Sequence, residues 1–124
     1  MEKEFIPYEQ ALALKELGFD EKCISVYLTS TKKFYPIYRP YTNNEQTDEI
    51  LRPLYQQAFS WFREKYGLYH SIGLDNSLEN DVNCDYQIIN HSQSISELET
   101  SFKSYEEAEL ACLKKLIEIV KNNE

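Results

Sequence analysis

Apolar side chains recur along this chain at two different periods, and this pattern limits the folds open to it more than any other feature. Around 7–17, 53–66 and from 104 onward they follow the helical spacing of three and four residues. Elsewhere they alternate with polar residues, as in a strand with one packed face. The chain therefore combines amphipathic helices with a sheet, and we expect its 124 residues to form a single domain, 1–124.

Residues typical of helix ends set the limits of the three predicted helices. Pro7 suits a first helical turn, and Gly18 and Gly67 suit the left-handed position that follows a last turn. Ser104 and Glu107 form a capping box, in which each side chain accepts a hydrogen bond from the backbone amide of the other residue. The third helix is therefore predicted to begin directly after Ser104.

Four segments are predicted as strands: 23–28, 34–38, 68–74 and 82–88. The alternation is clearest from Val82 to Ile88, whereas Pro36, which lacks an N–H group, places the second strand at a sheet edge or a bulge. We expect two hairpins that form one four-stranded, mainly antiparallel sheet with the three helices on one face. The predicted fold is α+β, in the order α-β-β-α-β-β-α.

Three segments lack a periodic pattern. Polar connections are expected at 39–47 and 75–81, with Thr47 or Asp48 capping a short helical turn. The segment 90–103 is rich in serine and glutamate, and we expect it to be a loop.

The net charge of −8 is concentrated in one part of the chain. Between Asp75 and Glu109, nine acidic residues stand against the single Lys103, so this stretch carries the whole imbalance. Direct nucleic-acid binding is not expected, because it normally requires a basic surface. One alternative function is that the acidic stretch imitates a nucleic-acid backbone and blocks a DNA- or RNA-binding protein.

Residues that carry chemistry are few and widely spaced. His70 and His91 lack the spacing of metal ligands, and Cys23, Cys84 and Cys112 form no CxxC pair, so we expect buried, reduced thiols and no metal. No glycine-rich phosphate-binding motif is present, and we predict no cofactor. The chain is therefore not expected to be an enzyme, although a site assembled from ordinary residues is kept as an alternative.

The chain has no apolar run of the roughly 18 residues that a membrane span needs, and its first residues do not resemble a secretory signal. We expect a cytoplasmic protein that does not enter membranes.

Ten tyrosines are a large supply of amphipathic rings for a chain of 124 residues, and such rings are common at protein interfaces. We therefore expect a protein-interaction or accessory module that binds another protein or a second copy of itself. The candidate interaction surface comprises Tyr27, Tyr35, Tyr86, Glu97 and Glu99.

Three segments together resemble a known family. They are PYEQALALKELGFDEKC (7–23), PLYQQAFSWFREKYGL (53–68) and SYEEAELACLKKLIEIV (104–120). They are similar to small uncharacterised proteins encoded by gut bacteria and by their phages and mobile elements. The resemblance covers most of the chain and implies a phage or prophage context, but it supplies no activity and no site residue. By analogy, small acidic proteins of this kind are often interaction proteins.

Overall fold

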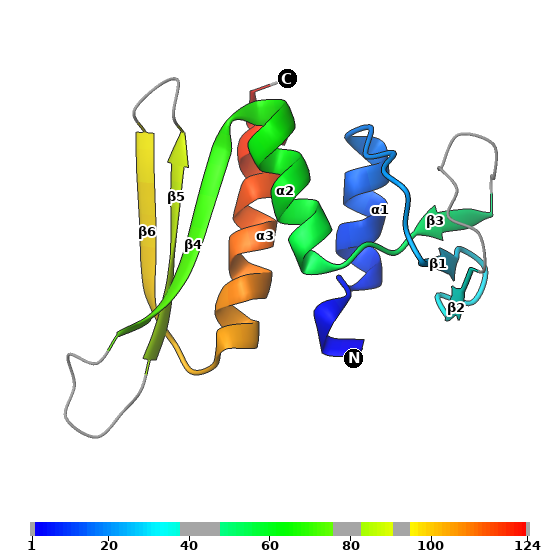
Figure 1. Cartoon of the computed structure of the whole chain (residues 1–124), viewed down its shortest axis with the longest axis horizontal. Helices are drawn as coiled ribbons and strands as arrows, with labels where there is room; N and C mark the ends of the chain where they lie inside the picture. The colour runs from blue at the N-terminus through cyan, green and yellow to red at the C-terminus, as the bar shows by residue number, and fades with distance from the viewer. Residues whose placement is uncertain (1, 38–47, 76–82, 91–94, 124) are drawn as a thin grey trace. The chain divides into compact units, whose positions relative to one another are not determined.

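The computed structural model describes residues 2–37, 48–75, 83–90 and 95–123 (Figure 1). Their elements are the 3-10 helix η1 (Glu2–Glu4), α1 (Tyr8–Glu16), β1 (Ser25–Leu28), β2 (Phe34–Pro36), β3 (Glu49–Leu51), α2 (Tyr55–Tyr66), β4 (Leu68–Asp75), β5 (Asn83–Asn90), β6 (Ile95–Phe102) and α3 (Tyr105–Asn122). The contacts divide the chain into two compact units, Met1–Ala58 and Phe59–Glu124, which we call unit 1 and unit 2.

The expected α+β fold with three helices is confirmed, but the expected four-stranded sheet is wrong. The strands form two separate three-stranded sheets, ordered β2-β1-β3 and β4-β5-β6. Each predicted hairpin gains a third strand: β3 replaces the expected helical turn, and β6 lies within the segment 90–103 that was predicted as a loop. The order of helices and strands after η1 is therefore α-β-β-β-α-β-β-β-α.

The three helices lie close to their predicted positions, and their ends explain why. Gly18 and Gly67, which follow the last turns of α1 and α2, have positive φ angles of 96° and 68°. Glycine adopts such left-handed angles without steric cost, because it has no Cβ atom. At α3, the hydroxyl of Ser104 accepts from the amide of Glu107 at 3.1 Å. The Glu107 carboxylate accepts from the amide of Lys103, also at 3.1 Å, instead of the predicted Ser104 amide.

In unit 1, β1 is the central strand of the sheet. Val26 lies opposite Tyr35 of β2 and Leu51 of β3. Pro36 belongs to the edge strand β2, as predicted from its missing N–H group. Strand β3 is too short to show a periodic pattern, and it forms because pairing with β1 buries Ile50 and Leu51, which are 0% and 1% exposed.

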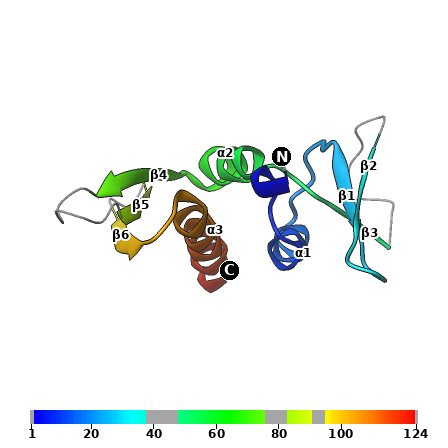
Figure 2. The same cartoon turned by 90° about the horizontal axis from the view of Figure 1, so that it is seen from below.

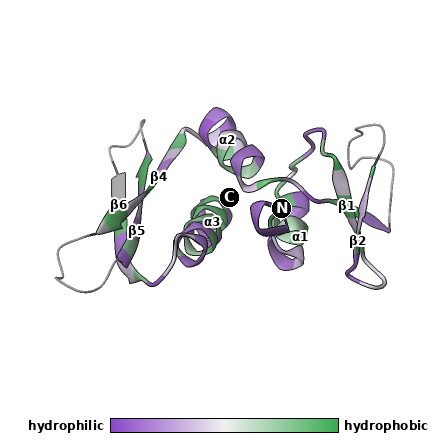
Figure 3. Cartoon of the chain, turned by 60° about the horizontal axis from the view of Figure 1, so that its bottom comes forward, coloured by the Kyte–Doolittle hydropathy of each residue, from purple (hydrophilic) through white to green (hydrophobic). Residues whose placement is uncertain are grey.

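In unit 2, α3 packs against one face of the sheet (Figures 1 and 2). The buried residues of α3 are Ala108, Cys112, Leu113, Leu116, Ile117 and Val120. Hydrophobic residues occur on the strands as well as on this helix (Figure 3). Strands β4 and β5 pair in unbroken register, whereas the pairing of β5 with β6 shifts between Cys84 and Tyr86.

Candidate interaction surface

The sheet of unit 2 has one face toward the helices and one face away from them. Cys84, Tyr86 and Ile88 of β5 are 2–4% exposed and face α3. Because successive side chains of a strand point to opposite faces, Asp85 and Ile89 lie on the other side. We call this side the open face; in Figures 1 and 2, α3 lies on the opposite side of the sheet.

Three large apolar side chains gather on the open face, one from each strand. Tyr69 of β4 is 46% exposed, Ile89 of β5 is 43% exposed and Leu98 of β6 is 60% exposed. Tyr69 lies directly opposite Ile89. Leu98 lies opposite Gln87, two residues before Ile89, so Leu98 and Ile89 are diagonal neighbours. We call Tyr69, Ile89 and Leu98 the open-face cluster.

A carboxylate lies beside this cluster. On the same face, Asp85 is opposite Gly73, and a Cβ atom added to Gly73 would lie 3.3 Å from the Asp85 Oδ1 atom. The carboxylate thus occupies the space above the glycine. The open face combines apolar side chains with a charged margin, which is the composition of many protein interfaces.

The described carboxylates of the acidic stretch lie on more than one side of unit 2. Asp85 points to the open face, whereas Glu106 and Glu107 are exposed in the first turn of α3 on the other side of the sheet. This dispersal counts against a nucleic-acid mimic, which needs its charges on one surface.

The structure does not bring the predicted tyrosines to one exposed surface. Tyr27 is 7% exposed in unit 1, and its hydroxyl donates to the carbonyl of Ile6 at 2.7 Å. Tyr86 is 2% exposed in unit 2 and stacks on Phe102 at 5.7 Å between ring centroids. Both are core residues, so their expected exposure is wrong; Tyr35 of β2 is 44% exposed.

Two glutamates were also predicted to belong to this surface. Glu99 is exposed on β6, whereas the side chain of Glu97 is not among those that the structure describes. Sequence reasoning missed Tyr69, Ile89 and Leu98. Leu98 fell in the predicted loop, and the one available signal was the pair Ile88-Ile89, in which an apolar residue interrupts the alternation of β5.

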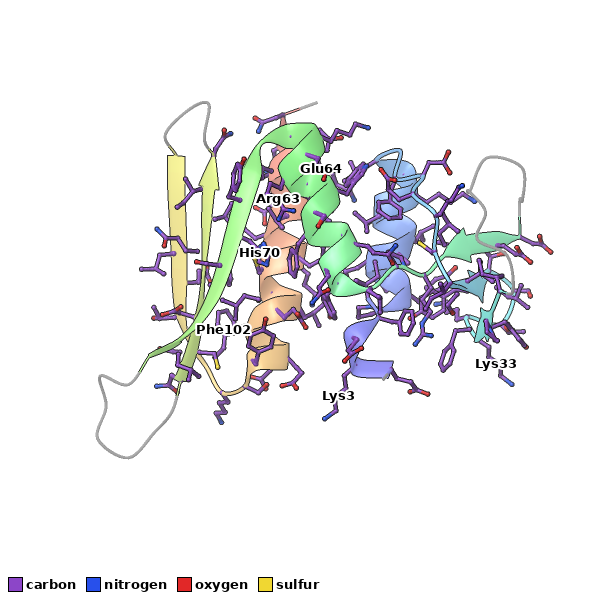
Figure 4. All side chains as sticks on the ribbon, viewed as in Figure 1. Lys3, Lys33, Arg63, Glu64, His70 and Phe102 are labelled. Carbon is purple, nitrogen blue, oxygen red and sulfur yellow. The ribbon has the colours of Figure 1, made fainter. Side chains whose placement is uncertain are left out.

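His70 packs as an aromatic ring. It lies 3.8 Å from Phe59 of α2 between ring centroids, nearly parallel at 16°. Burial, and secondarily the positive charge of Arg63, lower the pKa of His70 below its usual value (Figure 4). The imidazole is therefore neutral near pH 7. His91 lies outside the described residues, and within the described part of the chain no three metal-binding side chains come together.

The three cysteines are buried, as predicted. Burial, with a smaller contribution from nearby Glu21, raises the pKa of Cys23 to about 12. Burial, with a smaller contribution from Glu109, raises the pKa of Cys112 to about 12 as well. Both thiols are therefore protonated at neutral pH and are poor nucleophiles.

Unit 1 contains a buried cation. Arg52 is 5% exposed, and its guanidinium carbon lies 3.7 Å from the ring centroid of Phe34 and 4.0 Å from that of Phe5. Its Nη1 donates to Ser25 Oγ at 3.3 Å, while its Nε has no hydrogen-bond partner. The rings of Phe5 and Phe34 stabilise the charge by cation–π contact, and no ion pair with Arg52 is found among the described residues.

Comparisons with known proteins add no identity: no family model, curated protein or solved structure matches this chain. Among the described helices, none has the length and apolar character to span a membrane.

Proposed function

We propose that this chain is a protein-binding module without catalytic activity, and that it docks a partner protein on the open-face cluster of unit 2. One observation carries the proposal: neighbouring strands expose Tyr69, Ile89 and Leu98 on the face opposite α3. A contiguous exposed apolar patch with a polar margin is typical of a protein interaction site.

Protein partners are favoured over small molecules by the shape of this surface. The cluster lies on a pleated sheet, and its side chains come from the exposed side of three strands. Small-molecule sites are usually concave and bury most of the ligand, whereas protein interfaces are broad. The family resemblance makes phage and host bacterial proteins the first partners to seek, and this preference depends on the resemblance alone.

The size of the expected effect follows from apolar burial. Fully burying a leucine or isoleucine side chain contributes roughly 1.5–3 kcal/mol, and Ile89 and Leu98 are about half exposed before binding. Replacing both with threonine should therefore weaken binding by about 1–3 kcal/mol, or roughly 5- to 150-fold in Kd.

The test uses the full chain as bait in extracts of the cell that naturally makes it. The Ile89→Thr/Leu98→Thr variant is compared with the unmodified chain and with Ile24→Thr, a matched control that changes a 48% exposed isoleucine in unit 1. A partner bound by the unmodified chain and the control but lost by the double variant supports the proposal. Equal capture by the double variant, or no specific partner under any growth condition, contradicts it.

A further inference from the structure

The two edges of the sheet in unit 2 differ in how well they are protected from further pairing. Edge strand β6 contains two glutamates, Glu97 and Glu99, pairs with a shifted register and has the left-handed residue Ser101, with φ of 76°. Charges and irregular backbone of this kind prevent an edge strand from pairing with another chain.

Edge strand β4 has none of these features. It pairs with β5 in continuous register from Leu68 to Asp75 and contains no proline, and its one acidic residue, Asp75, is the last. His70 is neutral near pH 7 because burial lowers its pKa. Among the described residues, no strand pairs with the outer edge of β4. A long, regular edge whose only charged residue is at its end is a template for another strand.

We infer that β4 pairs antiparallel with β4 of a second copy of this chain, about a twofold axis at Ser71. The pairing joins two three-stranded sheets into one sheet and covers the unprotected edge. It differs from the proposed function, because it uses the backbone edge of β4 and a second copy, whereas the partner protein binds the open face; Tyr69 lies on both surfaces.

The register follows from the requirement that both faces stay continuous. Helix-facing residues of one copy must lie beside helix-facing residues of the other. This requires that the residue at the centre of the pairing lies directly opposite the same residue of the second copy. With the axis at Ser71, Tyr69 lies opposite Gly73 of the second copy, and Leu68 lies opposite Leu74. Asp75 then falls outside the paired segment.

The residues paired in this register suit one another. A tyrosine ring across from a glycine stabilises edge glycines in sheets, and here the ring would lie beside the Asp85 carboxylate that already contacts Gly73. Leu74 is 64% exposed, and in this register it lies opposite Leu68, an apolar residue that is 3% exposed, so strand pairing would cover part of the Leu74 side chain. An axis at Ile72 would instead bring Asp75 opposite Tyr69. These contacts favour a second copy of β4 over an unrelated strand.

The first test is the mass of the purified full chain by sedimentation equilibrium. We expect a dimer for the unmodified chain and a monomer for Ser71→Lys, which places two ammonium groups opposite each other at the axis. Thr100→Lys is the matched control, because it makes the same charge change at an exposed position on the other edge strand, and it should remain a dimer. Circular dichroism establishes that each variant is folded.

The second test fixes the register. Cα atoms that face each other in an antiparallel pair are close enough for a disulfide, so Ser71→Cys should form a covalent dimer under mild oxidation, whereas Thr100→Cys should not. A monomer at all concentrations, a dimer that survives Ser71→Lys, or no cross-link at position 71 overturns the inference. The Ile89→Thr/Leu98→Thr variant, which changes the open face and leaves β4 intact, is expected to remain a dimer, and this separates the inference from the proposed function.

Discussion

At the scale of single residues, Arg52 is the least expected feature of the chain. A guanidinium stays charged when buried, and burial without a counter-ion is costly unless other groups compensate. Here the compensation comes from the rings of Phe5 and Phe34 and from one hydrogen bond to Ser25, while Nε has no partner. The side chain therefore stabilises unit 1 chiefly by filling the space between two rings.

Two substitutions of Arg52 should lower the free energy of unfolding by different amounts. Arg52→Met keeps an unbranched side chain between the rings and removes a poorly satisfied charge, so the free energy of unfolding should change by less than about 1 kcal/mol. Arg52→Ala leaves the space between the rings empty and should lower the free energy of unfolding by about 2–4 kcal/mol. Urea unfolding of both variants measures the difference, and equal losses would show that the charge itself is required.

The stacked ring of His70 predicts a dependence of stability on pH. The folded chain favours the neutral imidazole, because burial and Arg63 lower its pKa, while an unfolded histidine gains a proton near pH 6.5. The contribution of His70 is therefore fully present above about pH 6.5 and is lost as the pH falls below it.

His70→Phe keeps the stacking on Phe59 but cannot gain a proton. We expect its thermal midpoint to fall less between pH 7 and pH 5 than that of the unmodified chain. Parallel curves for the two proteins over this range would contradict the assigned environment of His70.

At the scale of elements, the three helices could be predicted from the sequence because each has a local end signal and a periodic apolar stripe. Gly18, Gly67 and Ser104 act within a turn of the helices they limit, so no distant contact is needed to find them. The hydrogen bond that the Glu107 carboxylate accepts was predicted to come from the amide of Ser104, but it comes from the amide of Lys103. These two amides are one residue apart, and the sequence does not distinguish between them.

The missed strands lack such local signals. Strand β3 is three residues long, and β6 is an edge strand whose polar residues read as a loop. Both are stabilised by pairing with another strand, β3 with β1 and β6 with β5, and this pairing is not visible in the apolar pattern of β3 or β6 alone. The open-face cluster was missed for the same reason, because Leu98 joins Tyr69 and Ile89 only through the pairing of β6.

At the scale of the whole molecule, the chain contains two small units, each with its own sheet and its own buried side chains. Helix α3 covers one face of the sheet in unit 2, and the acidic residues that the structure describes there lie on both sides of the sheet. Neither the net charge of −8 nor the tyrosine content identified the candidate surface, which depends on which face of each strand is covered.

Hydroxyl-radical footprinting of the full chain, alone and with its captured partner, tests the central claim most directly. In the free chain, Ile89 and Leu98 should be oxidised as exposed side chains, while Tyr86 and Ile88 on the helix-facing side should be protected. Binding of the partner should protect Ile89 and Leu98. Protection of these two residues in the free chain, or their unchanged oxidation in the complex, would contradict an open, partner-binding face.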